Sequence, residues 1–251
     1  MKDVWAAGDA YEPYVGRWSR LVAAEFLTWL DLPSGSRCLD VGCGTGALTS
    51  QLVQVGSATG VDASEGFVSY AAAHEPAATF RVGDATSLPF EDDLFDAAVS
   101  GLVLNFVPDH AAMVREMSRV TIAGGSVAVY VWDYAEGMQF MRRFWDVAAA
   151  VDPEAPDEAA RFPVCAPEPL AALFHDAGLS EVAGREIVVP TTFVDFADFW
   201  EPFLGGQGAA PAYVATLGLD ARSEIEQRLH EELGDGPIPL TARAWAVRGV
   251  C

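Results

Sequence analysis

Hydrophobic and polar residues follow one another along the chain in blocks that predict strands alternating with helices. Short, nearly continuous apolar runs are typical of buried parallel strands, whereas apolar residues three and four positions apart indicate amphipathic helices. Strands are predicted over residues 37–41, 58–62, 79–82, 95–100, 126–132, 185–192 and 240–248. Helices are predicted over residues 15–30, 47–52, 65–73, 109–120, 136–151, 168–177, 196–204 and 223–233. This alternation favours βαβ units that share a parallel sheet.

The less regular segments lie in the second half of the chain. Residues 152–167 contain four prolines and predict a loop, and a glycine-rich break occupies residues 205–208. Neither segment is convincing as a linker between domains, so we expect a single domain over residues 1–251. Its core is expected at about 34–133, 168–192 and 238–250, with cap or lid elements at 1–32, 134–167 and 193–237.

Composition narrows the possible functions. The chain has 251 residues, of which 51% are hydrophobic, and a formal net charge of −21. This acidity disfavours nucleic acid, which proteins bind by neutralising phosphates with Lys and Arg, and it equally disfavours anionic membrane surfaces. No apolar run approaches the ~18 residues of a membrane helix. Lys2 is the only lysine in the sequence, which excludes mechanisms that need a catalytic lysine inside the fold.

The four cysteines carry no metal or disulfide pattern. Cys38, Cys43, Cys165 and Cys251 include no C-x-x-C pair, and no cluster of His, Asp or Glu has the spacing of metal ligands. With no signal peptide recognised, these residues predict reduced thiols and a cytoplasmic protein. We expect no metal, a small-molecule substrate as the partner, and a monomer or homodimer.

The stretch Leu39–Gly46 is the most informative part of the chain. It reads L-D-V-G-C-G-T-G and joins a predicted strand to a predicted helix, which is how nucleotide-binding βαβ units begin. The dinucleotide fingerprint is G-x-G-x-x-G, whereas the glycines here are one residue closer and Asp40 precedes them. A carboxylate at that position would repel a pyrophosphate. It would suit a cationic ligand that carries an amino group.

Two more acids follow later strands. Asp62 ends the second predicted strand, 22 residues beyond Asp40, where a carboxylate can accept hydrogen bonds from both hydroxyls of a ribose. Gly83-Asp84-Ala85 follows the third predicted strand. The alternative for Asp62 is an acid that only caps a turn. Three acids at successive strand ends, beside a glycine turn, predict a cradle for a positively charged nucleoside.

These motifs resemble, in the expected order, those of the class I methyltransferases that depend on S-adenosylmethionine (SAM). The match comprises the Asp40–Gly46 turn, Asp62, Gly83–Ala85, and Phe95-Asp96 leading to Gly124-Gly125. It covers roughly the middle half of the chain and is closest to the methyltransferase type 11-like branch, which contains ubiquinone and menaquinone C-methyltransferases. The sequence departs from the family at Ile122-Ala123, where a proline usually precedes the glycines.

The resemblance implies a Rossmann-like α/β fold. Its sheet is expected to be seven-stranded and mostly parallel, with the last strand antiparallel, helices on its flanks and a helical cap. SAM is implied as the methyl donor, with S-adenosylhomocysteine (SAH) as the product. The glycine turn and Asp40 would face the methionine end, Asp62 the ribose, and Asp84 with Ala85 the adenine. The expected cofactor-binding residues are Tyr14, Arg17, Asp40, Gly42, Cys43, Gly44, Gly46, Asp62, Ala63, Asp84, Ala85, Ser100 and Gly101.

Acceptor binding is expected near the start of the chain and after the fourth and fifth strands. An aromatic ring can stabilise a sulfonium through a cation–π contact, and Arg17 could pair with the carboxylate of the methionine moiety. The alternative for these N-terminal residues is packing. Candidate residues of the acceptor pocket are Tyr11, Trp18, Asn105, Phe106, Trp132 and Tyr134. The acceptor is expected to be small and partly hydrophobic, and O, N and C remain open as the atom methylated.

No pattern selects a catalytic residue. His110 is a candidate base because it follows the fourth strand, although a histidine at a helix start is more often a capping or surface group. An NAD(P)-dependent oxidoreductase is the main alternative, disfavoured by the tight glycine spacing, by Asp40 and by the missing catalytic lysine. A non-catalytic SAM-binding protein is a further alternative.

Overall fold

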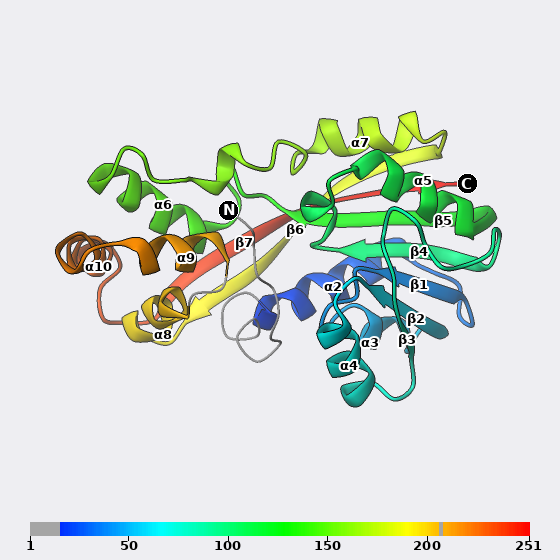
Figure 1. Cartoon of the computed structure of the whole chain (residues 1–251), viewed down its shortest axis with the longest axis horizontal. Coiled ribbons are helices and arrows are strands. Elements are labelled where there is room, and N and C mark those ends of the chain that lie inside the picture. The colour runs from blue at the N-terminus through cyan, green and yellow to red at the C-terminus, as the bar shows by residue number, and fades with distance from the viewer. Residues whose placement is uncertain (1–15, 206–207) are drawn as a thin grey trace. The chain divides into compact units, whose positions relative to one another are not determined.

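The computed structural model describes residues 16–205 and 208–251, and it contains the expected mixed sheet (Figure 1). In this part of the chain, seven strands lie in the order β3-β2-β1-β4-β5-β7-β6, six of them parallel and the last antiparallel. They are β1 (Arg37–Val41), β2 (Ser57–Asp62), β3 (Thr79–Val82), β4 (Phe95–Gly101), β5 (Thr121–Trp132), β6 (Ser180–Phe193) and β7 (Ile238–Val250). The fold class predicted from the sequence is therefore confirmed.

Helices fill most of the connections between the strands. The α-helices are α2 (Arg17–Leu30), α3 (Thr49–Leu52), α4 (Glu65–His74), α5 (His110–Val120), α6 (Gln139–Val151), α7 (Pro167–Asp176), α8 (Phe196–Trp200), α9 (Ala209–Thr216) and α10 (Leu219–Leu233). Short 3₁₀ helices in the described residues are η2 (Leu104–Phe106), η3 (Glu158–Ala160) and η4 (Glu201–Leu204). No helix in the described ranges combines the length and apolarity needed to cross a membrane.

Two differences from the predicted elements have physical causes. Helix α9 was not predicted, because its residues are apolar on several sides and therefore lack the amphipathic period; Ala210, Tyr213 and Val214 are all buried. Strand β5 begins earlier than expected, at Thr121. The pairing of β4 with β5 shifts register between Phe95 and Ala97. The consecutive residues Gly124 and Gly125 lie within this irregularity of β5.

The described chain divides into two compact units. The sheet unit comprises residues 19–131, 164–187 and 244–251, and the cap unit comprises residues 16–18, 132–163, 188–205 and 208–243. Whether the two behave as one domain, as the sequence suggests, stays a prediction.

The sheet unit is built on β1, whose residues are buried between β2 and β4. Parallel pairs join Leu39 to Thr59 on one side and to Ala98 on the other, and Leu39 is fully buried. Figure 1 shows α3 and α4 on one side of these strands and α5 and α7 on the other. The start of α5 is capped by Asp109, whose carboxylate accepts a hydrogen bond from the backbone N–H of Ala112. The glycine turn thus leaves the carboxyl end of a rigid central strand.

The cap unit has an aromatic core of its own. Phe144 stacks on Phe203 with ring centroids 4.5 Å apart, and Phe140 contacts Phe193, Phe199 and Phe203 at 4.6–5.2 Å. All five rings are fully buried or nearly so. These five phenylalanines therefore stabilise the cap unit and are not open to a ligand.

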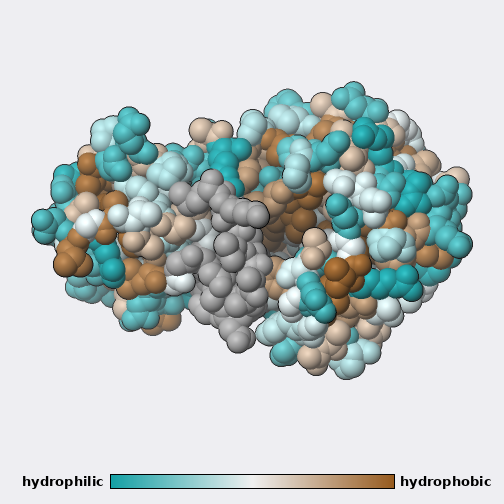
Figure 2. Space-filling view, viewed as in Figure 1, coloured by the Kyte–Doolittle hydropathy of each residue, from teal (hydrophilic) through white to brown (hydrophobic). Residues whose placement is uncertain are grey.

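The outer surface is mostly polar, as the net charge suggests. Figure 2 shows hydrophilic residues over much of one face of each unit, with small apolar patches between them. The large hydrophobic residues that are exposed lie apart from one another in the sequence, and Leu219 is the most exposed at 81%. Isolated residues of this kind are normal in folded proteins.

We predict that Phe144→Ala destabilises the protein by about 3–5 kcal/mol, because it leaves a cavity beneath Phe203. Chemical denaturation followed by fluorescence would measure the change in free energy of unfolding. Leu219→Ala is the matched control and should change stability by less than about 0.5 kcal/mol. Equal effects of the two substitutions would contradict the assignment of Phe144 to the cap core.

Candidate cofactor site

The turn after β1 depends on glycine. Gly42, Gly44 and Gly46 have φ angles of +76°, +51° and +89°, a region that side chains disfavour. A Cβ on Gly42 would lie 2.5 Å from Cγ1 of Val103, whereas a Cβ on Gly44 would meet no described atom within 4 Å. The turn is therefore packed tightly at its first glycine and open at its second, which leaves backbone accessible to a ligand.

Asp40 is a buried carboxyl with one unmet oxygen. Its Oδ2 accepts a hydrogen bond from the hydroxyl of Thr49 at 2.6 Å, while Oδ1 is buried and has no hydrogen-bond partner among the described residues. Burial raises the pKa of Asp40 to about 7; the Thr49 hydrogen bond opposes this shift and the charge of Asp62 adds to it. Buried carboxylate oxygens are normally paired. A ligand that brings a positive charge or an N–H donor would complete this site.

Asp62 connects the glycine turn to the next helix. Its Oδ2 accepts from the backbone N–H of Gly44 at 3.0 Å, and its Oδ1 accepts from the backbone N–H of Ser64 at 2.8 Å, with Ala63 between. Burial raises the pKa of Asp62, and these two hydrogen bonds oppose the shift. Each carboxylate oxygen retains a lone pair for a further donor. The geometry suits the ribose role, although that role itself stays a prediction.

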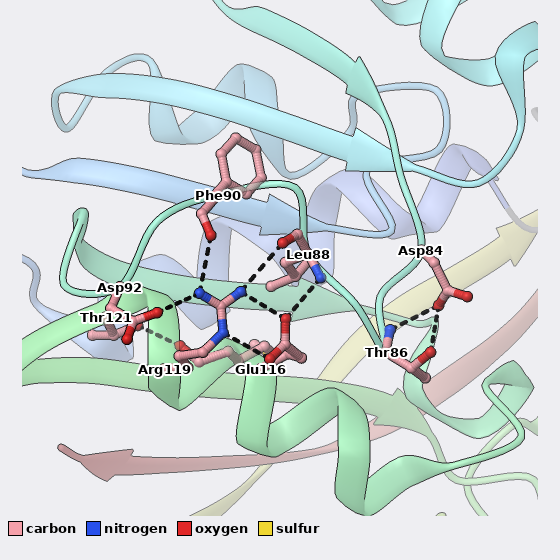
Figure 3. Close-up of polar contacts among 9 residues, drawn as sticks. Asp84, Thr86, Leu88, Phe90, Asp92, Glu116, Arg119 and Thr121 are labelled. Atoms are coloured by element: carbon pink, nitrogen blue, oxygen red, sulfur yellow. Dashed lines mark hydrogen bonds and ion pairs between the residues drawn. The ribbon is translucent and has the colours of Figure 1, made fainter.

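Asp84 lies on an exposed turn after β3 and contacts Thr86 there (Figure 3). The backbone N–H of Gly83 donates to the carbonyl of Asp62 at 3.0 Å, which joins the two acidic positions through the chain. Oδ1 of Asp84 accepts from both the N–H and the hydroxyl of Thr86 at 2.7 Å, and these bonds lower the pKa of Asp84. The side chain is therefore ionised at neutral pH, with Ala85 next to it.

The end of β4 reaches the same edge of the sheet. The hydroxyl of Ser100 donates to the carbonyl of Val41 at 2.6 Å, so its O–H is used within the protein and the hydroxyl can only accept from a ligand. A Cβ on Gly101 would lie 2.4 Å from the hydroxyl oxygen of Tyr130. Leu102 follows with a φ of +63°, an uncommon conformation for a leucine. Such strain is frequent where a chain is shaped for function.

Asn105 is the most unusual of the predicted acceptor residues. It is 7% exposed, and neither its amide nitrogen nor its amide oxygen has a hydrogen-bond partner in the described chain. Phe106 beside it is half-buried. His110 is half-buried at the start of α5, and nothing in its surroundings selects it as a base.

The other predicted acceptor residues are packed in the cap unit. Trp18 lies against Phe140 and Phe193 at 5.6 and 5.1 Å, Trp132 is 3% exposed, and Tyr134 packs on Phe162 at 4.9 Å. Their burial supports the packing alternative, while a role in acceptor binding stays a prediction. Tyr11 and Tyr14 lie outside the described residues.

Arg17 also belongs to the cap unit. Its Nη1 forms an ion pair with Asp198 at 2.8 Å, and its guanidinium carbon lies 4.5 Å from the ring centroid of Trp18. Its Nε and Nη2 are buried without hydrogen-bond partners. These two donors form the fork that suits a carboxylate, so the predicted pairing with the methionine carboxylate is chemically reasonable and still untested.

Sequence reasoning missed the residues that support the site. Thr49 bonds Asp40, and Arg119 with Glu116 holds the segment that follows Asp84 (Figure 3). An acid–x–x–arginine pair on one helix was visible in the sequence. The partners of this pair could not be recognised in the sequence, because they include backbone carbonyls of a loop about thirty residues away.

The fold is a doubly wound α/β sheet, and its buried acids and glycine turn form a candidate cofactor site at the carboxyl edge of that sheet. Residues 39–129 match the family model described as a methyltransferase domain. The demethylmenaquinone methyltransferase of Roseiflexus castenholzii is 38% identical over 177 residues, which cover 61% of this chain and 71% of that protein. The chain belongs to the class I SAM-dependent methyltransferases.

Solved structures support the fold. The YcgJ protein of Bacillus subtilis superimposes with a TM-score of 0.60 at 19% identity, covering 92% of this chain and 97% of that one. Phosphoethanolamine N-methyltransferase 2 of Haemonchus contortus, solved with SAH and phosphomonomethylethanolamine, gives a TM-score of 0.59 at 16% identity, covering 96% and 56% of the two chains. SAM is the methyl donor of this protein, and the orphaned oxygen of Asp40 and the open glycine turn fit such a ligand.

We predict that the raised pKa of Asp40 makes the ligand-free protein less stable as pH rises. Between about pH 4 and 7 the folded state holds a proton on Asp40 that the unfolded state has released. The free energy of unfolding therefore falls as pH rises through this range. Relative to Asp40→Asn, wild type should lose up to about 1.4 kcal/mol per pH unit. Urea denaturation of both proteins at pH 5, 6, 7 and 8 measures this difference. If the free energies of unfolding of the two proteins changed equally with pH, the prediction would be wrong.

Proposed function

We propose that this SAM-dependent methyltransferase transfers the methyl group to a small, partly hydrophobic metabolite. The class of reaction follows from the family; the acceptor is our inference. The SAM site is proposed from one observation. The backbone N–H of Gly44 is held by Asp62, while the buried Oδ1 of nearby Asp40 has no hydrogen-bond partner in the described chain. A relative named demethylmenaquinone methyltransferase supports an acceptor with a hydrophobic part.

In our proposal the donor lies along the carboxyl edge of the sheet unit. Asp62 accepts from the ribose hydroxyls, Asp84 from the adenine amine, and the N–H of Ala85 donates to a ring nitrogen. Asp40 and the Gly42–Gly46 backbone, including Cys43, face the methionine end. The backbone of Ser100 and Gly101 accepts from the amino group. Arg17 and Tyr14 remain candidates for the methionine end.

The chemistry asks little of the protein beyond alignment. Bound SAM supplies a methyl group on a positively charged sulfur. The protein must hold the acceptor in line with that methyl, and orientation of this kind is worth roughly 7–11 kcal/mol. The buried acids of the site favour a positive charge. No general base is assigned, since the need for one depends on the acceptor.

An oxidoreductase is the less favoured alternative, because the turn presents a carboxylate where a pyrophosphate would lie. A SAM-binding protein without activity would share the donor site and differ only in turnover. Release of SAH during incubation with a metabolite library separates an enzyme from such a protein and identifies the acceptor. A cytoplasmic location and a monomeric or homodimeric state stay expectations from the sequence.

We predict that Asp62→Ala weakens SAH binding by about 1.5–3 kcal/mol, the size of a hydrogen bond to a charged group. Asp62→Asn, which keeps an acceptor for the N–H of Gly44, separates loss of the ribose contact from collapse of the turn. Isothermal calorimetry with SAH and with NADH measures both affinities. Asp176→Asn, an exposed change in the same unit, should leave SAH affinity unchanged. Tight NADH binding without SAH binding would overturn the proposed function.

We also predict that Asn105→Leu lowers kcat/KM for the acceptor by roughly 10-fold or more, because the acceptor loses its hydrogen bond. The same change should leave SAH affinity intact. It should not destabilise the ligand-free protein, since it removes a buried amide that lacks partners. A stability loss with unchanged turnover would contradict an acceptor role for Asn105. Activity assays on the acceptor identified above, with thermal melts, provide both readouts.

A further inference from the structure

The segment between β3 and β4 carries Asp84 but has little regular structure of its own. Within residues 83–94 the described pairing is an isolated bridge between Asp84 and Ser87. Ser87 also donates its N–H to the carbonyl of Asp84 at 3.1 Å. A compact turn therefore holds Asp84, and the position of that turn depends on what anchors its two ends.

The far end is anchored by Arg119 in the last turn of α5 (Figure 3). Its Nε and Nη2 donate to the two carboxylate oxygens of Glu116, both at 2.7 Å. Its Nη1 donates to the carbonyl of Phe90 at 2.9 Å and to Asp92 at 2.6 Å, and Nη2 donates to the carbonyl of Leu88 at 3.2 Å. An arginine has five N–H donors, and all five are used here.

Glu116 completes the anchor from the other direction. Its Oε2 accepts from the backbone N–H of Leu88 at 2.8 Å, so both backbone polar groups of Leu88 are held by one ion pair. The hydrogen bond from Arg119 lowers the pKa of Glu116, and the pKa of Arg119 is raised in return by its bonds to Glu116 and Asp92. The pair thus stays charged through the neutral range.

The anchor reaches Asp84 through direct packing. Pro89 lies between the two anchored residues, Leu88 and Phe90. A Cβ on Gly83 would lie 2.9 Å from Cδ of Pro89 and 2.8 Å from Cγ2 of Val61, so Gly83 is packed between this proline and β2. Any shift of Pro89 therefore moves the residue that immediately precedes Asp84.

We propose that Arg119 and Glu116 are positioning residues that set the purine specificity of the donor site by fixing the segment that carries Asp84. The proposal rests on the proposed function, in which Asp84 accepts from the adenine amine. Lysine cannot replace Arg119, because an ammonium has three donors and lacks the planar fork that spans Glu116 and two carbonyls.

The test compares SAH with S-inosyl-L-homocysteine, in which a carbonyl replaces the adenine amine. Calorimetry on wild type should show SAH bound roughly 10-fold or more tightly than the inosine analogue, since that carbonyl faces a carboxylate. Arg119→Met and Arg119→Lys should lower SAH affinity and bring the two affinities towards equality. Glu116→Gln, which keeps its shape and an acceptor for Leu88, should give a smaller change in the same direction.

Two controls separate positioning from general stability. Asp84→Ala gives the ratio of the affinities for SAH and the inosine analogue that is expected when the adenine amine is not recognised. Arg37→Met removes another two-pronged arginine–carboxylate pair, to Asp96 at 3.1 and 2.9 Å, which joins the starts of β1 and β4. It should lower the melting temperature without changing the ratio of the two affinities.

The outcomes of these experiments test the positioning role and the proposed function separately. No SAH binding by wild type would overturn the proposed function, and the positioning role with it. An unchanged ratio in Asp84→Ala would remove adenine recognition from Asp84 and so refute the inference while leaving SAM binding intact. A changed ratio in Asp84→Ala with an unchanged ratio in folded Arg119 and Glu116 variants would refute the positioning role alone.

Discussion

Asp62 is the residue on which the candidate site depends. Its carboxylate accepts from the N–H of Gly44 and from the N–H of Ser64, and its own carbonyl accepts from the N–H of Gly83. One residue therefore fixes the glycine turn, the start of α4 and the segment after β3. Hydrogen bonds from backbone N–H groups to a carboxylate are among the stronger neutral–charged contacts in proteins. They place the three recognition elements before any ligand arrives, which is the preorganisation that binding and alignment require.

The cost of this arrangement is electrostatic. Burial raises the pKa of both Asp40 and Asp62, and the charge of Asp62 raises the pKa of Asp40 further. In a protein with a net charge of −21, few positive groups are available to relieve them. In our proposal a cationic donor does so on binding. The acids that weaken the empty protein would then be the ones that select a positively charged ligand.

The sequence predicted those parts of the protein that depend on local pattern. The βα alternation, the glycine turn and the acids at successive strand ends follow from spacing alone, and the sheet has the seven strands and the antiparallel last strand that the resemblance implied. It could not predict that the hydroxyl of Ser100 donates to the carbonyl of Val41, or that the guanidinium of Arg119 also donates to a loop about thirty residues away, because both depend on tertiary contacts. Helix α9 was missed since a helix buried on several sides has no amphipathic period. Trp18 is fully packed despite its place in a predicted lid, which shows that aromatic composition does not separate a core from a pocket.

The buried polar groups of the sheet unit that lack hydrogen-bond partners support the positions proposed for the two ligands. Among its described residues, the buried side-chain atoms without hydrogen-bond partners belong to Asp40 and Asn105. Asp40 can only accept while it is ionised, so it requires a donor such as the amino group of SAM. Asn105 both donates and accepts, so it requires a partner with a hydroxyl, carbonyl or amide. Asp40 lies near the carboxyl end of β1 and Asn105 follows β4, and these are the two strands between which ligands of doubly wound sheets bind. The site is thus incomplete in two chemically different places, which supports our proposal of a cationic donor and of a partly hydrophobic acceptor that carries a polar group.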